Sequence, residues 1–166
     1  MREVEFDHAF SEMLGASVAF QAWVLSSSRF ARFVGEARLL VEEQSKARRS
    51  ARHWWKHWWG YMPDGSSSET DIFAVFENAA GQRFALHFEN KPAHGVLELT
   101  QAAGYRPRAA LWANNPRYLR YTDFETVLLA PKGFIAAHGE CAAQFDRCLP
   151  YEDIGQWVPQ FAMALS

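Results

Sequence analysis

The sequence predicts a single α/β domain over residues 1–166 with a mixed β-sheet, and three observations lead to this prediction. The N-terminal third is mostly helical in pattern. Two alternating apolar runs, 70–77 and 82–91, are separated by "NAAG", which is typical of a β-hairpin. Helical and strand-like patterns then alternate to the end of the chain. With 49% hydrophobic and 22% charged residues, the composition is that of a folded protein.

Three helices are expected before the hairpin. Asp7 is a suitable N-cap for a helix over 8–25. Further helices are expected over 29–43 and 44–59. On a wheel of the third helix, tryptophan and alanine gather on one side and a basic face lies opposite: Lys46, Arg49, His53, Lys56 and His57. This basic face is either a phosphate contact or a solvated surface.

The remaining elements follow from glycine and proline positions and from hydrophobic periodicity. The segment "GYMPDGSSSE", 60–69, reads as a loop before the hairpin. After the hairpin the expected elements are a helix over 93–115 broken near Pro107, a strand over 124–130, a helix over 132–145, a strand over 146–149, and a last helix from Tyr151 broken by Pro159.

The second hairpin strand brings an acid and a lysine to one face. Side chains alternate along a strand, so Glu89 and Lys91 point the same way, while Phe84, Leu86 and Phe88 point into the core. The pairing register of the two hairpin strands decides whether Asp71 lies on the face of Glu89, because a slip of one residue sends the two side chains to opposite faces.

If the turn centres on Ala80, antiparallel pairing places Asp71 opposite Glu89, with their Cβ atoms about 5 Å apart. Two carboxylates that close repel each other unless a cation lies between them. Oxygen ligands from two acids suit Mg²⁺ or Mn²⁺. Lys91, on the same face, could orient a water molecule or neutralise charge on a phosphate oxygen.

Asp71 followed by Glu89-Asn90-Lys91 resembles the PD-(D/E)XK nuclease superfamily, which has a restriction-endonuclease-like fold. The segment "QAAGY" is similar to the QxxxY motif of the RecB-type and lambda-exonuclease-like members, and it places Gln101 and Tyr105 one helical turn apart. One position departs from the pattern, since Thr70 stands where the superfamily has proline. A literal Pro63-Asp64 pair lies in the upstream loop.

The superfamily often places a glutamate on the helix before the hairpin, and Glu12 is the candidate here. It is the only charged residue between positions 9 and 25. A carboxylate in so apolar a helix needs a partner, and we expect a bound metal ion or Lys91 to supply one.

The resemblance implies a Mg²⁺-dependent nuclease, with Mn²⁺ able to substitute. Asp71, Glu89 and Glu12 would bind the metal, Lys91 would assist the attacking water, and Gln101 and Tyr105 would contact substrate or support the site. DNA is expected as the substrate in preference to RNA, with specificity supplied by loops, a homodimer or a partner protein.

Two alternatives stay open: a catalytically silent nuclease-fold module that binds nucleic acid or a partner protein, and a metal-dependent hydrolase of small phosphorylated molecules. The N-terminus has no secretory pattern and no apolar run suits a bilayer span, so a cytoplasmic protein without a membrane partner is expected.

Overall fold

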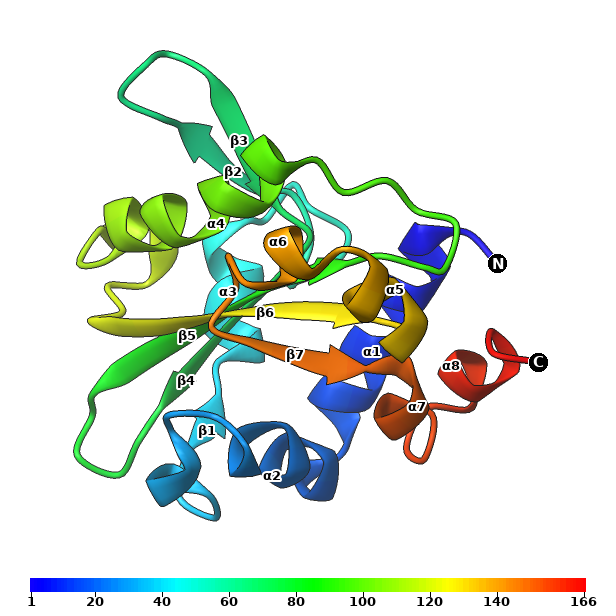
Figure 1. Ribbon diagram of the computed structural model, residues 1–166. Helices are drawn as coiled ribbons and strands as arrows, with labels where there is room; N and C mark the ends of the chain where they lie inside the picture. Colours follow the sequence, from blue (N-terminus) through cyan, green and yellow to red (C-terminus); the bar gives the residue numbers. More distant parts are fainter.

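The computed structural model describes residues 1–166, and at its centre is a five-stranded sheet in the order β1-β4-β5-β6-β7 (Figure 1). Its strands are β1 Arg38–Leu39, β4 Ile72–Glu77, β5 Arg83–Asn90, β6 Asp123–Ala130 and β7 Arg147–Pro150. β1, β4 and β5 pair antiparallel, whereas β5, β6 and β7 pair parallel. The predicted α/β class with a mixed sheet is confirmed.

Helices cover both faces of this sheet. One face carries α1 Glu3–Ala16, α2 Val18–Ser26, α7 Tyr151–Ile154 and α8 Pro159–Met163, and the other carries α4 Leu99–Trp112, α5 Lys132–Ala137 and α6 Gly139–Ala142. The short helix α3, Val41–Ala47, and two 3₁₀ turns at Ala31–Phe33 and Pro116–Tyr118 complete the helical elements. None of the helices combines the length and apolar character needed to cross a bilayer.

The β4–β5 hairpin has the register that the sequence predicts for a turn centred on Ala80. Ile72 pairs with Phe88 and Phe76 pairs with Phe84. Continued by one residue, this register places Asp71 beside Glu89. The apolar side chains of β5 face α1 and α2, as predicted: Phe84, Leu86 and Phe88. The alternate residues therefore face α4.

The predicted helix over 44–59 is wrong, and so is the loop over 60–69. Only α3 at its start is helical, and the chain then runs irregularly into β2, Trp58–Tyr61. β2 pairs with β3, Ser67–Thr70, in a separate two-stranded hairpin that projects above α4 (Figure 1). His57 has a φ of 61°, which an α-helix excludes. Cross-strand pairing of the tryptophan-rich segment outweighs its helical periodicity.

Other boundaries also differ from the predicted ones. Asp7 is not an N-cap, because α1 begins at Glu3, and the first helix is interrupted at Ser17, whose Oγ accepts a hydrogen bond from Phe20 N at 3.1 Å. The predicted helix over 29–43 is replaced by a 3₁₀ turn, β1 and the start of α3. Pro107 lies inside α4 without ending it, and Pro159 begins α8.

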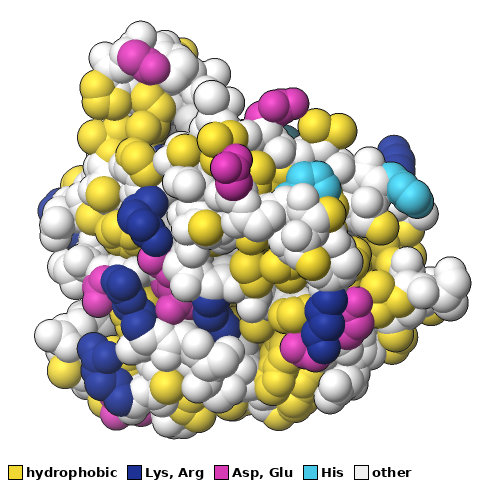
Figure 2. Space-filling model, viewed as in Figure 1, with side chains coloured by type: hydrophobic (Ala, Val, Ile, Leu, Met, Phe, Trp, Pro, Cys, Tyr) yellow, Lys and Arg dark blue, Asp and Glu magenta, His cyan; other side chains and the backbone are white.

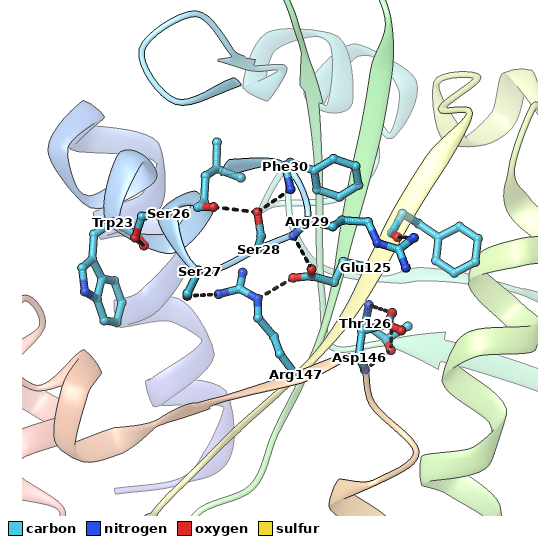
Figure 3. A network of polar contacts seen from close by, with 12 residues as sticks. Trp23, Ser26, Ser27, Ser28, Arg29, Phe30, Glu125, Thr126, Asp146 and Arg147 are labelled. Carbon is cyan, nitrogen blue, oxygen red and sulfur yellow. Dashed lines mark hydrogen bonds and ion pairs between the residues drawn. The ribbon is translucent and has the colours of Figure 1, made fainter. Parts of the chain in front are cut away.

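A polar network joins β6 and β7 to the chain that leaves α2 (Figure 3). Glu125 forms an ion pair with Arg147 and accepts a hydrogen bond from Arg29 N at 2.9 Å. Arg147 Nη1 donates to Ser27 Oγ at 2.8 Å, and Arg29 pairs with Asp123 at 3.2 Å. These acids are balanced by arginines and stabilise the parallel edge of the sheet.

Candidate functional site

Glu89 and Lys91 form a buried ion pair where β5 ends. Their exposed fractions are 1% and 6%. Lys91 Nζ lies 2.9 Å from Glu89 Oε1 and 3.3 Å from Glu3 Oε2, in the first turn of α1. The lysine is therefore held between a strand carboxylate and a helix carboxylate, which offsets the cost of burying its charge.

Two side chains of α4 hold Glu89 from the other direction. Gln101 Nε2 donates to Glu89 Oε1 at 2.8 Å, and the Tyr105 hydroxyl donates to Glu89 Oε2. The Tyr105 hydroxyl also accepts a hydrogen bond from Asp71 N at 3.4 Å. Gln101 and Tyr105 lie one turn apart on the same helical face, so α4 fixes both oxygens of one carboxylate.

Asp71 joins this cluster at the start of β4. Its Oδ2 accepts a hydrogen bond from Asn90 N at 3.2 Å. Its Oδ1 makes no hydrogen bond and is not among the buried unpaired polar atoms, so it reaches solvent. Asp71 thus contributes an oxygen that is free to bind a ligand, beside a carboxylate whose oxygens are both held.

Asn90, between Glu89 and Lys91, points to the opposite face of the sheet and contacts α1. Its Nδ2 donates to Asp7 Oδ1 at 2.7 Å, and its Oδ1 accepts from the Tyr151 hydroxyl at 2.5 Å. All three side chains are buried. These hydrogen bonds fix the position of α1 relative to the end of β5.

Sequence reasoning missed Glu3 and Asp7, although a signal for both was present. Positions 3, 7, 10 and 14 follow the spacing of one helical face, and Phe10 and Leu14 on that face are fully buried. A helix that begins at Glu3 therefore turns both acids toward the sheet. The pattern was missed because the predicted helix began at residue 8, whereas α1 begins at Glu3.

Glu12 lies elsewhere, and the expectation that it is buried is wrong. Its side chain is exposed and lines a surface groove between α1 and α8 with His8, Ala16 and Met163. The structure brings together five of the six predicted site residues: Asp71, Glu89, Lys91, Gln101 and Tyr105. Glu12 stands apart from them.

The electrostatics of the site are dominated by an excess of buried acid. Burial, together with Glu89 and Asp7, raises the pKa of Asp71 well above its ordinary value. Burial raises the pKa of Asp7 to about 7. Burial opposes the charge of Lys91, but Glu89, Glu3 and Asp71 together raise the pKa of that amine. Three acids, Glu89, Glu3 and Asp71, act on one lysine, so the cluster favours an additional positive charge.

A second buried network of hydrogen bonds lies next to the site and joins α4 to β5. Arg108 Nε donates to Thr70 Oγ1 at 3.1 Å, Thr70 Oγ1 lies 2.9 Å from His87 Nδ1, and His87 Nε2 lies 3.1 Å from the Tyr121 hydroxyl. The Tyr121 hydroxyl donates to Ala109 O, which assigns the proton of a neutral His87 to Nε2. Burial and Arg108 lower the pKa of His87. This histidine is structural.

The donor set of the site consists of hard carboxylate oxygens, the type that Mg²⁺ and Mn²⁺ prefer. No group of three or more His, Cys, Asp or Glu side chains is arranged as a ready metal cage. Mg²⁺ commonly binds through one or two carboxylates and completes its shell with water and substrate phosphate. Asp71 offers one free oxygen, and Glu89 could become the second ligand by exchanging a hydrogen-bond donor for the cation.

Comparisons with protein-family models, with curated proteins and with solved structures find no match to this chain. The class of protein therefore has to be described from the fold and the site alone. The chain is an α/β protein that carries a buried carboxylate–lysine cluster at the carboxyl end of β5, between α1 and α4.

Proposed function

We propose that this protein is a metal-dependent nuclease with a restriction-endonuclease-like core. One observation carries the proposal: the β4–β5 register brings Asp71 to Glu89 and Lys91, and α4 adds Gln101 and Tyr105 to the same cluster. The cluster gathers residues spread over 35 positions of sequence, from 71 to 105, and these are the residues that the resemblance to the superfamily names.

The order of elements supports this core. An antiparallel hairpin, β4–β5, is followed by the crossover helix α4 and by β6, which runs parallel to β5. Ligands of open α/β sheets bind beyond the carboxyl ends of the strands. The acid cluster lies at such an end, next to the first turns of α4.

Asp71 and Glu89 are the residues that would hold Mg²⁺ or Mn²⁺. A bound divalent cation supplies Lewis-acid polarisation of a phosphate oxygen and a lowered pKa for bound water. Glu12 is not proposed as a ligand, because it is exposed on another part of α1.

The chain's own residues have distinct roles in this proposal. Because its pKa is raised, Lys91 stays an ammonium at neutral pH and can only donate hydrogen bonds. It therefore orients an attacking water or neutralises charge on the phosphate, and it does not remove a proton. Gln101 and Tyr105 fix the orientation of Glu89. DNA is the proposed substrate.

The second candidate is a silent nuclease-fold module that binds nucleic acid or a partner protein. One observation favours it: three donors from Lys91, Gln101 and Tyr105 already occupy both oxygens of Glu89. A carboxylate whose two oxygens both accept hydrogen bonds can have a purely structural role. The two candidates differ in whether Glu89 binds a cation.

The test is a Mn²⁺ titration by calorimetry of the wild type, Asp71→Asn, Glu89→Gln and Glu12→Gln, followed by digestion of linear, circular and single-stranded DNA in the same buffer. Each variant is near-isosteric, and circular dichroism of each one checks that the fold is retained. The proposal expects Mn²⁺ binding and cleavage in the wild type and in Glu12→Gln, and loss of both in the other two variants. Absence of both in the wild type would reject the nuclease and favour the silent module.

A further inference from the structure

The β2–β3 hairpin presents two aromatic rings on its outer face. In β2, Trp58 and Gly60 are buried against the body, so Trp59 and Tyr61 point the other way. Their ring centroids are 5.5 Å apart with an edge-to-face angle of 84°. Tyr61 is 66% exposed, and hydrophobic side chains gather on this projecting hairpin in Figure 2.

One arginine flanks these rings. The Arg117 guanidinium lies 5.6 Å from the centroid of the Trp59 ring. The Arg48 guanidinium lies 5.2 Å from the ring centroid of Trp58, which is buried on the inner face of the hairpin. Burial lowers the pKa of Arg48, and the positive charge of the nearby Arg117 lowers it further. Neither forms an ion pair. The one acid on the outer face, Glu69, lies 3.7 Å from His57 Nδ1.

The chain leading into the hairpin is also strongly basic. Between Glu43 and Asp64 there are five cationic side chains and no acid. Of the five, Lys46 alone is in an ion pair, with Glu42 at 3.5 Å. Lys56 lowers the pKa of Asp7, so the two side chains are close to each other. The basic segment therefore runs from the acid cluster to the hairpin. The surface suits a polyanion.

The hairpin is joined directly to the acid cluster. Trp58 pairs with Thr70 at its base, and Thr70 is followed by Asp71. Tyr61 pairs with Ser67 three residues farther along, which is roughly 10 Å toward the tip. Along the strands, Trp59 and Tyr61 therefore lie only a few residues from Asp71.

We propose that the outer face of the β2–β3 hairpin binds a single-stranded segment of nucleic acid, with bases stacked on Trp59 and Tyr61 and phosphates held by Arg117. Unpaired bases expose the faces that stack on aromatic rings, whereas a duplex buries them. The inference rests on the proposed function in one respect, since the strand held by the hairpin is the strand presented to Asp71.

The binding test uses a fluorescein-labelled oligothymidylate of about 20 nucleotides, longer than the ~4–16 nucleotides that one binding domain typically covers. Anisotropy is measured in EDTA, so binding is separated from hydrolysis. Trp59→Ala/Tyr61→Ala is expected to weaken binding by about tenfold or more, because each stacked base contributes independently. Tyr61→Phe keeps a ring and should bind as the wild type does.

The phosphate contact has its own matched control. Arg117→Ala should lower the slope of log K against log salt by about 0.7, the value for one phosphate contact to a single strand. Arg32→Ala removes another exposed arginine that lies over an aromatic ring, Phe33, at 4.3 Å and away from the hairpin, and it should leave the slope unchanged.

The outcomes separate this inference from the proposed function. Oligothymidylate binding that depends on Trp59 and Tyr61 supports the inference even if Mn²⁺ produces no cleavage, in which case only the nuclease fails. Cleavage by a protein whose oligothymidylate binding is unchanged in Trp59→Ala/Tyr61→Ala overturns the inference and leaves the nuclease standing. A wild type that binds a duplex of the same length more tightly than the single strand also overturns it.

Discussion

Lys91 Nζ lies 2.9 Å from Glu89 Oε1, and both side chains are buried where β5 ends. The pair is not isolated, because Glu3 contacts the lysine and Gln101 contacts the carboxylate. Buried ion pairs contribute to stability mainly when every donor and acceptor is satisfied. Both oxygens of Glu89 are satisfied and Lys91 contacts two carboxylates, so removing one partner of the pair has a predictable cost.

Lys91→Ala should destabilise the fold by about 3 kcal/mol, because Glu89 and Glu3 would be left without their cation. Glu89→Gln/Lys91→Met should recover part of this loss, since the double variant buries no unpaired charge at β5. Urea unfolding of both variants measures the difference. Equal destabilisation of the single and double variants would show that the ion pair itself is not the origin of the cost.

Tyr105→Phe should weaken Mn²⁺ binding by about tenfold or more, because the hydroxyl that orients Glu89 is lost. It should also lower the free energy of unfolding by about 1–3 kcal/mol, since Glu89 and Asp71 N lose a partner. Tyr118→Phe is the matched control, because it removes a buried hydroxyl that donates to Trp59 O at 2.9 Å. Its stability should fall while its Mn²⁺ affinity stays unchanged.

Asp7 predicts a pH dependence of stability. Its pKa is about 7 in the folded protein, above the value of about 3.9 for an unfolded chain. Between these values the folded state binds more protons than the unfolded state, so stability is full below pH 4 and is lost as the pH rises toward 7. The slope from this group is at most about 1.4 kcal/mol per pH unit.

Asp7→Asn keeps an acceptor for Asn90 Nδ2 and removes the titration. Unfolding free energies measured from pH 4 to 7.5 should therefore decline less in Asp7→Asn than in the wild type. Parallel curves for the two proteins would show that Asp7 does not titrate in this window. The exposed Glu5→Gln is a control, since its carboxylate lies on α1 away from Asn90.

The sequence predicted the hairpin and its cluster better than it predicted the helices around them. Alternation along β5 and a turn centred on Ala80 determine which side chains face each other, so Asp71 and Glu89 could be placed by counting. Gln101 and Tyr105 came from the resemblance to the QxxxY motif, and helical spacing placed them on one face of the helix. The placement of all four residues needs only local geometry.

The errors arose where tertiary contacts decide. The tryptophans after α3 satisfy a helical wheel, but Trp58 pairs with Thr70 in a strand and donates its Nε1 proton to Trp54 O at 2.7 Å. Glu12 looked buried because its helix is apolar almost all round, yet its side of α1 borders an open surface groove and stays exposed. Periodicity identifies apolar stripes and does not say which stripe meets the sheet.

Glu12→Ala should change neither Mn²⁺ affinity nor, beyond about 0.5 kcal/mol, the free energy of unfolding, because its side chain is exposed and makes no hydrogen bond or ion pair. Calorimetry and urea unfolding check the two expectations. Loss of Mn²⁺ binding in this variant would mean that α1 turns by a large angle when the metal binds.

Gly60→Ala tests how closely the β2–β3 hairpin is seated on the body. A Cβ atom at this position would lie 2.5 Å from the Tyr118 hydroxyl oxygen and 2.9 Å from Trp112 Nε1. Those two rings are stacked with centroids 4.1 Å apart and cannot both move aside. The variant should lose about 1–3 kcal/mol in urea unfolding.

The same change should also reach the acid cluster. Gly60 lies in β2, whose Trp58 pairs with Thr70, and any displacement of β2 is carried along β3 to Asp71. Mn²⁺ affinity should therefore fall together with stability. Gly133→Ala is the control, because a Cβ there meets no atom within 4 Å and the residue lies in α5. A Gly60→Ala protein that is destabilised but binds Mn²⁺ normally would show that the hairpin moves independently of Asp71.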